Sequence, residues 1–277
     1  MTQVPTIRLN NGVHIPQLGF GVFKVPPRET AETVRSAFAA GYRHIDTAQM
    51  YGNEEGVGRA LAESGLSRDE VFLTTKLDND GHGFDAALRR LEVSLQKLGT
   101  DHVDLYLIHW PRPRDDRYVD TWRGLEKALA EGRTRSIGVS NFTVEHLGRL
   151  AQETGTVPAV NQVELHPRFA QAGLRAYHAG HGIATEAWSP IGQGKGLLDD
   201  PVLAGLARKH GRSAAQVVLR WHVQLGNIVF PKSMHPQRMR ENIDVFDFEL
   251  AGDDMQEISA LDRGAAGRLG PNPDTFG

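Results

Sequence analysis

Four polar residues of different chemistry each lie at or just beyond the end of a short apolar run. Asp46 ends YRHID, Lys76 ends VFLTTK, and His109 ends VDLYLIH, while Tyr51 follows Asp46 by five residues. A carboxylate, an ammonium, an imidazole and a phenol in one pocket would suit protonation of an oxyanion, with Tyr51 as the general acid. An ammonium about 4 Å from the phenol would contribute about 4 kcal/mol, or roughly three pK units. This attraction would be enough in principle to bring the pKa of Tyr51 near neutrality.

The other three residues would support Tyr51. Asp46 would keep Lys76 charged and oriented, and His109, neutral beside a lysine, would donate a hydrogen bond to a carbonyl oxygen. Taken singly, each side chain also has an ordinary structural explanation, such as a buried histidine, a solvated lysine, a packed tyrosine or a turn-capping aspartate. None of the four supplies electrons, so a flavin or a nicotinamide must provide a hydride.

Eight short apolar runs alternate with helix-length segments along the chain. The segments carry helix signals, such as the prolines that begin 25–41, the acidic first turn of 52–65 and the leucine repeat of 84–99. Eight strand–helix units in about 220 residues predict an α/β fold, a (β/α)8 TIM barrel. We expect strands near 17–21, 42–45, 71–75, 103–108, 135–139, 158–162, 182–186 and 227–230.

This fold would give the four residues a common location, because a TIM barrel has its active site at the carboxyl ends of its strands. Asn11-Gly12 predicts an N-terminal β-hairpin with a type I′ turn, which would cap the bottom of the barrel. An open doubly wound sheet is the alternative, but no GxGxxG occurs between a strand and a helix. We expect one barrel domain over 1–277, with 263–277 as an irregular C-terminal tail near the active-site face.

Composition excludes several classes of function. With a net charge of −3 and both signs interspersed, neither nucleic acid nor a membrane surface is indicated as a partner. The chain has no cysteine, which excludes disulfides, thiolate metal sites and cysteine nucleophiles, and its twelve histidines lack metal-ligand spacing. No apolar run of about 20 residues and no secretory signal occur. We expect a cytoplasmic monomer without an obligate protein partner.

Six motifs follow one another from about residue 4 to 262. They are GYRHIDTAQMYGNEEGVGRAL, TTKL, VDLYLIHWP, RSIGVSNF, AVNQVELHP and VFPKS with a later R and EN. Together they resemble the aldo-keto reductases, and YGNEEGVG, WSPIGQGK and ENIDVFDF resemble the bacterial 2,5-diketo-D-gluconate reductase subgroup most. The resemblance implies a TIM barrel, NADPH bound without a Rossmann domain, and hydride transfer to an aldehyde or ketone. It also implies a catalytic tetrad of Asp46, Tyr51, Lys76 and His109.

The resemblance further implies a set of residues that bind NADPH. Ser140, Asn141 and Gln162 would bind the nicotinamide carboxamide, and Trp188 would stack on the ring unless it is a plain core residue. The glycine-rich segment 189–196 would cover the pyrophosphate, and a cationic cluster after 231 would clamp the 2′-phosphate, so we expect NADPH to be preferred over a weaker NADH. The cofactor-binding residues are Val22, Phe23, Ser140, Asn141, Gln162, Trp188, Ser189, Ile191, Gly192, Gln193, Lys195, Gly196, Lys232, Ser233, Met234, His235, Arg238, Glu241 and Asn242.

Phe23, Asp78 and Trp110 are the expected substrate residues. Asp78 stands where the family commonly has tryptophan, so its carboxylate either disfavours anionic keto acids at the pocket mouth or points to solvent. Three arginines within 112–117 either attract an anion or pair with Asp115 and Asp116, and the pairing is the favoured interpretation.

The leading prediction is an NADPH-dependent reductase of small aldehydes or ketones. One alternative is a nicotinamide-binding redox sensor or regulatory subunit with slow turnover, although the complete tetrad does not indicate a loss of catalysis. A second alternative is an aldolase or dehydratase that uses Lys76 as a Schiff-base nucleophile. Asp46 argues against that chemistry, because a lysine paired with a carboxylate stays protonated.

Overall fold

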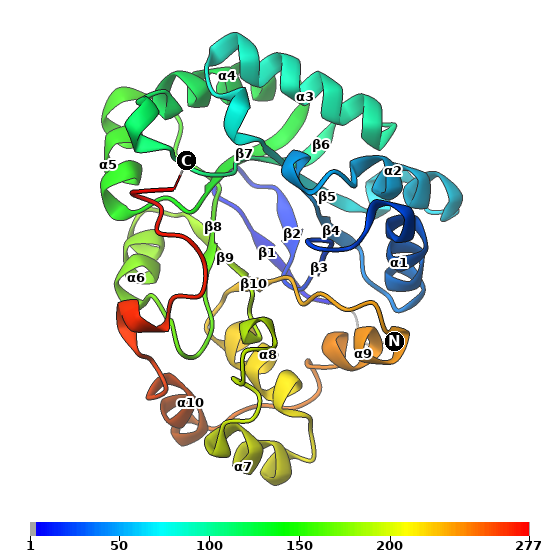
Figure 1. The fold of residues 1–277 in the computed structure, drawn as a ribbon, viewed down its shortest axis with the longest axis vertical. Coiled ribbons are helices and arrows are strands. Elements are labelled where there is room, and N and C mark those ends of the chain that lie inside the picture. Colours follow the sequence, from blue (N-terminus) through cyan, green and yellow to red (C-terminus); the bar gives the residue numbers. More distant parts are fainter. Residues whose placement is uncertain (1–3, 277) are drawn as a thin grey trace.

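A ring of eight parallel strands forms the centre of the computed structural model, which describes residues 4–276 (Figure 1). Neighbouring strands are hydrogen-bonded in chain order from β3 to β10. The ring closes where Leu18 bridges Val229, with the Gly19 N–H donating to the Val229 carbonyl over 2.9 Å. The strands are β3 (Phe20–Gly21), β4 (His44–Asp46), β5 (Phe72–Leu77), β6 (Val103–Ile108), β7 (Thr134–Ser140), β8 (Val160–Glu164), β9 (Ala184–Trp188) and β10 (Ile228–Val229).

Helices surround this ring, and each strand is followed by at least one of them (Figure 1). The predicted TIM barrel is therefore confirmed, and every predicted strand overlaps an observed one. α3 shows the local logic, because Leu91, Leu95 and Leu98 are buried at helical spacing and Gly99 ends the helix with φ 66°. The helices are α1 (Pro27–Ala39), α2 (Glu54–Glu63), α3 (Phe84–Leu98), α4 (Tyr118–Ala130), α5 (Val144–Glu153), α6 (Ala172–Gly180), α7 (Pro201–His210), α8 (Ala214–Gln224), α9 (Pro236–Ile243) and α10 (Gly252–Ser259).

The N-terminal hairpin of β1 (Thr6–Arg8) and β2 (His14–Pro16) caps the amino end of the barrel, as predicted. Ile15 is fully buried in an apolar cluster with Phe72 and Ile228, which lie at the starts of their strands. The predicted type I′ turn is wrong, because Gly12 has positive φ while Asn11 does not. The Asn11 side chain instead donates to the Arg135 carbonyl and to Ser136 Oγ, at 3.0 Å each, so this residue anchors the hairpin to β7.

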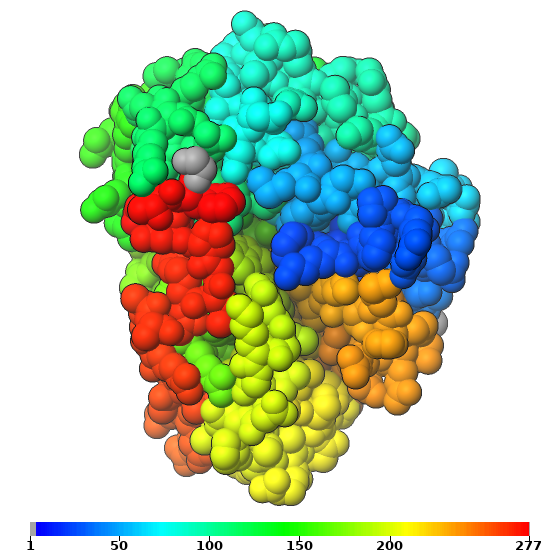
Figure 2. All heavy atoms as spheres, in the orientation of Figure 1, coloured from blue at the N-terminus to red at the C-terminus, as the bar shows by residue number. Residues whose placement is uncertain are grey.

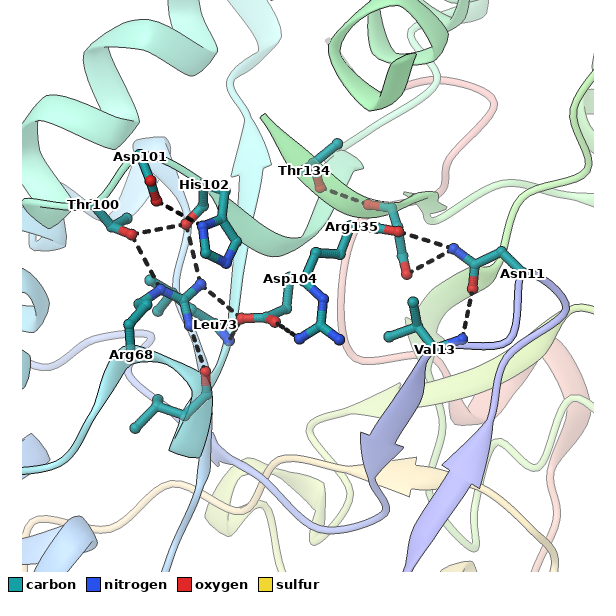
Figure 3. A network of polar contacts seen from close by, with 12 residues as sticks. Asn11, Val13, Arg68, Leu73, Thr100, Asp101, His102, Asp104, Thr134 and Arg135 are labelled. Atoms are coloured by element: carbon teal, nitrogen blue, oxygen red, sulfur yellow. Dashed lines mark hydrogen bonds and ion pairs between the residues drawn. The ribbon is translucent and has the colours of Figure 1, made fainter. Parts of the chain in front are cut away.

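A buried carboxylate organises the same end of the barrel (Figure 3). Asp104 accepts hydrogen bonds from Arg68 at 2.7 Å, from Arg135 at 2.8 Å and from the Leu73 N–H at 2.9 Å. Figure 3 shows Asn11 joined to the Arg135 side of this network. The amino end is thus closed by apolar packing and satisfied polar groups, and the four candidate residues lie at the other end.

The C-terminal tail after α10 lies against the carboxyl ends of β6 and β8. In Figure 2 the tail is red and lies next to the yellow-green segment that follows β9. The Phe276 ring lies 4.5 Å from the Trp110 ring. The buried Glu164 carboxylate accepts the backbone N–H groups of Leu269 and Gly270, at 2.6 and 2.8 Å. Apart from a 3₁₀ turn at Gly264–Gly267, the tail is irregular.

Among residues 4–276, no helix combines the length and the apolar character needed to cross a bilayer.

Candidate active site

The structure brings Asp46, Tyr51, Lys76 and His109 together at the carboxyl ends of β4, β5 and β6. Lys76 Nζ donates to both oxygens of Asp46, at 2.7 and 2.8 Å, and to the Thr47 carbonyl at 2.9 Å. The same Nζ lies 3.4 Å from Tyr51 Oη. The Tyr51 ring meets the His109 imidazole edge-on, with 5.7 Å between centroids.

Tyr51 is held by the loop between β4 and α2. It ends a 3₁₀ helix, Gln49–Tyr51, and Gly52 follows it in the left-handed region with φ 66°. Gln49 Nε2 donates to the Arg90 carbonyl and to Ser94 Oγ on α3, at 2.8 Å each. The Gln49 side chain thus fixes the short helix that carries the phenol to α3.

Lys76 and Asp46 form a buried ion pair. The Lys76 side chain has no solvent exposure, and that of Asp46 is 6% exposed. Burial alone would lower the pKa of Lys76, but the Asp46 charge and the hydrogen bonds to Asp46 outweigh it and raise that pKa. The ammonium therefore stays charged, and removal of either partner would leave an uncompensated buried charge.

Tyr51 is a protonated phenol in this structure. Burial raises its pKa above 10, while the Lys76 ammonium lowers it and Asp46 raises it again. The predicted pKa near neutrality is therefore wrong, because the loss of hydration outweighs an ammonium that Asp46 already neutralises. A phenol that keeps its proton at neutral pH suits the role of a general acid.

His109 is neutral, as predicted. Burial, and then the nearby Lys76 charge, lower the pKa of His109 well below 6.5. Its Nδ1 has no hydrogen-bond partner among the described residues. Its backbone carbonyl accepts from Asn141 Nδ2 at 3.0 Å, which ties the end of β6 to the end of β7.

Three of the expected nicotinamide residues lie next to this cluster on adjoining strand ends. Ser140 Oγ donates to the Gln162 carbonyl at 2.7 Å, and Trp188 Nε1 donates to Asn141 Oδ1 at 2.8 Å. Asn141 has φ 64°, a left-handed conformation that is uncommon for a residue with a side chain and that clusters at functional sites. The Trp188 side chain is half-buried, so part of it remains accessible.

The hydrogen bonds of Gln162 differ from those expected from the sequence. Its Nε2 donates to Asp46 Oδ1 at 2.8 Å and to Glu186 Oε2 at 2.9 Å, which uses both N–H donors of the amide. Only the amide oxygen of Gln162 is left to accept a hydrogen bond from a nicotinamide carboxamide. Glu186 was not among the predicted site residues.

The glycine-rich segment after Trp188 takes the backbone conformations that its sequence suggests. Gly192, Gly194 and Gly196 have φ of 73°, 69° and 71°, and a Cβ on Gly192 would come within 2.8 Å of Leu197 Cβ. Ser189 and Gln193 share the left-handed region without being glycines. Gln193 and Lys195 are exposed, Ile191 and Ser189 are half-buried, and the segment lies directly beyond β9.

The cationic cluster lies around the start of α9. Lys232, His235 and Arg238 are exposed, and within residues 4–276 neither Lys232 nor Arg238 forms an ion pair. Ser233 Oγ accepts the His235 N–H at 3.1 Å. Two uncompensated cations beside a helix N-terminus fit a phosphate dianion, so the donor set is chemically suited to NADPH.

The remaining cofactor candidates occupy the same region or the β3 end. Glu241 accepts from Gln237 at 3.0 Å, Asn242 is buried, and Met234 is half-buried. Val22 is fully buried, so its contribution to a cofactor site is limited to its backbone and to packing.

Phe23 and Trp110 flank the tetrad. Phe23 is 48% exposed and its ring lies 5.0 Å from that of Tyr51. Trp110 directly follows His109 and packs on Phe276 of the tail, a residue that the sequence did not single out.

Asp78 is half-buried just beyond the end of β5, and its effect on anionic substrates stays a prediction. Its Oδ1 accepts the Asn79 N–H at 2.6 Å and caps the 3₁₀ helix Asn79–Gly81. The favoured pairing of the arginine loop is confirmed for Arg112, which contacts Asp115 at 2.7 Å. Asp116 pairs instead with Arg149 on α5, outside the loop.

The sequence did contain a signal for Glu186. In the apolar strand ATEAW, a carboxyl lies two residues before Trp188, and the period of two puts both side chains on one face of β9. Gln162, the register partner of Glu186, lies directly opposite on β8. The position of Glu186 on the inner face of a barrel strand could therefore have indicated that it belongs to the site.

A TIM barrel with a buried lysine–aspartate pair beside a protonated tyrosine and a neutral histidine defines an enzyme built for proton transfer at a carbonyl. The sequence pattern described as Aldo/keto reductase family matches residues 17–263, and the chain belongs to this family.

Relatives match over nearly the whole chain. An "Aldo-keto reductase" of Mycobacterium sp. (strain KMS) is 56% identical over 272 residues, 98% of each chain. The "Methylglyoxal reductase DkgA" of Yersinia pestis is 51% identical over 279 residues, covering 100% of this chain and 99% of its own. The crystal structure of a mutant of Gox0644 in complex with NADPH superposes with a TM-score of 0.95 at 49% identity, covering 100% of both chains.

Proposed function

We propose that this protein is an NADPH-dependent reductase of small carbonyl compounds, that methylglyoxal and similar 2-oxoaldehydes are its substrate class, and that Tyr51 is the general acid. The observation that carries the proposal is the contact of a protonated, half-buried phenol with the Lys76 ammonium at 3.4 Å. The relative named methylglyoxal reductase and the NADPH complex of the Gox0644 mutant support the choice of substrate class and cofactor.

Each member of the tetrad has a distinct task in the proposed reaction. The neutral His109 binds the carbonyl oxygen through its N–H, and the Tyr51 hydroxyl gives that oxygen its proton as negative charge develops there. Lys76 stabilises the resulting phenolate, Asp46 keeps Lys76 in place, and solvent returns the proton to Tyr51. When bound, NADPH supplies the hydride that the carbonyl carbon gains.

The residues that would hold NADPH divide by chemistry. Asn141, Ser140 and the free oxygen of Gln162 offer directional hydrogen bonds to a carboxamide, and the accessible part of Trp188 offers a stacking surface. The Lys232 ammonium offers a point charge to the 2′-phosphate, and the Arg238 guanidinium offers two parallel N–H donors. We therefore propose preference for NADPH over NADH.

The test follows nicotinamide absorbance with NADPH, and then with NADH, against methylglyoxal, aromatic aldehydes, diketones and 2,5-diketogluconate. Oxidation of NADPH with the highest kcat/KM for methylglyoxal is expected. Binding of NADPH without turnover of any carbonyl would replace the proposal with a nicotinamide-sensing role, and absence of NADPH binding would remove the cofactor assignment.

Three further properties belong to the same proposal. We infer a single barrel domain with its tail as part of the active-site wall, a monomer without an obligate protein partner, and a cytoplasmic location. The tail contacts at Trp110 and Glu164 support the first of these. Light scattering during size-exclusion chromatography tests the second, and fractionation of cells that express the chain tests the third.

A further inference from the structure

A buried carboxyl lies beneath the tetrad and takes no part in the mechanism above. Glu186 lies in the middle of β9, where its register partners are Gln162 on β8 and Ile228 on β10. Glu186 has no solvent exposure. Its Oε2 accepts from Gln162 Nε2 at 2.9 Å, while its Oε1 has no hydrogen-bond partner among residues 4–276.

One amide connects this carboxyl to the catalytic ion pair. The Nε2 of Gln162 donates to Glu186 and, at 2.8 Å, to Asp46 Oδ1. Asp46 is the carboxylate that holds Lys76. Because Asp46 is charged, the Gln162 amide must direct its nitrogen, not its oxygen, toward the two acids.

Burial and the Asp46 charge favour the protonated form of Glu186, and they outweigh the Gln162 hydrogen bond and the Lys76 charge, which favour the ionised form. The ionisable groups that act on it are Asp46 on β4 and Lys76 on β5, since the flanking positions hold Gln162 and Ile228, which do not ionise. Burial, and then the Asp46 charge, raise the pKa of Glu186 to about 8. A carboxylate oxygen without a donor is also costlier to bury than the oxygen of a neutral acid.

We propose that Glu186 is a positioning residue for the reduction proposed above, and that by keeping its proton it leaves the Lys76 ammonium to Asp46 and Tyr51 alone. When Glu186 releases that proton to solvent, a second negative charge joins the network. A negative charge raises the pKa of a nearby phenol, so Tyr51 becomes a weaker acid. Glu186 thereby sets how strongly the tetrad can protonate a substrate above neutral pH.

The first test needs no activity. Because the folded pKa of about 8 exceeds the unfolded value near 4.5, the protonated group stabilises the fold fully below about pH 4.5, and this contribution is lost as the pH rises toward 8. In the Glu186→Gln variant, the side chain at position 186 is neutral at every pH. The Tm of the wild type should therefore fall relative to that of Glu186→Gln between about pH 5 and 8. A Tm difference that is independent of pH would mean that Glu186 is already ionised, and would overturn the proposal.

The second test reads the coupling to Tyr51 from the pH profile of kcat/KM. In Glu186→Gln, residue 186 adds no charge that raises the pKa of Tyr51, so the alkaline decline should begin about one pH unit lower than in the wild type. Glu54→Gln is the matched control. Glu54 is also a buried carboxyl with a raised pKa, but it bonds Thr75 and not Gln162. An alkaline decline at the same pH in wild type and Glu186→Gln would limit Glu186 to a structural role.

Failure of the proposed function and failure of this inference give different results. If the wild type reduces no carbonyl compound, the proposed reductase function and the coupling to Tyr51 are both rejected. The Tm comparison still decides whether Glu186 holds a proton. If Glu186→Gln does not fold, infrared spectra of Glu54→Gln should show a protonated carboxyl band that disappears as the pH passes about 8. Absence of that band would overturn the proposal.

Discussion

At the scale of single residues, the site is governed by the cost of burying charge. Lys76 and Asp46 tolerate burial because each compensates the other, and Tyr51 and His109 respond to the same burial by staying neutral. The four side chains therefore adopt at neutral pH the protonation states that carbonyl reduction requires.

Replacement of one member of the ion pair should cost more stability than replacement of both. Lys76→Met leaves Asp46 charged and without its partner, which should reduce the free energy of unfolding by about 3–5 kcal/mol. Adding Asp46→Asn should restore part of that loss, while carbonyl turnover stays abolished in both variants. Urea denaturation of the single and double variants measures the difference. Equal stability of the two would show that the pair is not buried as described.

The cations near α9 should distinguish the two nicotinamides. Charge-assisted hydrogen bonds contribute about 1.5–3 kcal/mol, so Lys232→Ala and Arg238→Ala should each weaken NADPH binding by about 10- to 100-fold. NADH lacks the 2′-phosphate, so its Kd should not change. Arg240→Ala, an exposed arginine on the same helix, is the control. Fluorescence titration gives all the Kd values, and parallel losses for NADPH and NADH would refute a phosphate clamp.

At the scale of elements, two contacts hold the C-terminal tail against the strand ends. Phe276 packs on Trp110, and Glu164 holds the backbone of Leu269 and Gly270. Burial acts to raise the pKa of Glu164, but the hydrogen bonds from His166 and the tail outweigh it and lower that pKa. The carboxylate thus stabilises the tail above the unfolded pKa of about 4.5, and this stabilisation is lost as the pH falls through the folded value.

Glu164→Gln should loosen the tail without unfolding the barrel. An amide keeps one acceptor oxygen, so one of the two backbone N–H groups loses its partner, at a local cost of about 1–3 kcal/mol. Amide hydrogen exchange over 263–276 should become faster, and the KM for aromatic aldehydes should rise with the Kd for NADPH unchanged. Asp274→Asn alters an exposed tail carboxylate and serves as the control. Unchanged exchange in Glu164→Gln would show that other contacts hold the tail.

At the scale of the whole molecule, sequence predicted what periodic patterns and strand ends encode. The barrel, its eight strands and the convergence of Asp46, Lys76 and His109 follow from apolar runs and from the rule that parallel strands end on one face. The prediction of a type I′ turn was wrong because Asn11 donates a hydrogen bond to Arg135, more than a hundred residues away. The prediction for the pKa of Tyr51 was wrong because dehydration depends on packing that local sequence does not reveal. Phe276 and Glu164 were missed for the same reason.

The central claim is that Tyr51 is the proton donor of a reductase. The most direct measurement is kcat/KM for NADPH-dependent reduction of methylglyoxal by Tyr51→Phe, with NADPH binding measured alongside. Because the substitution removes only the hydroxyl, we expect kcat/KM to fall by about 10²- to 10⁴-fold while the Kd for NADPH stays at the wild-type value. Activity within a few-fold of the wild type would contradict the account and assign the proton to another group.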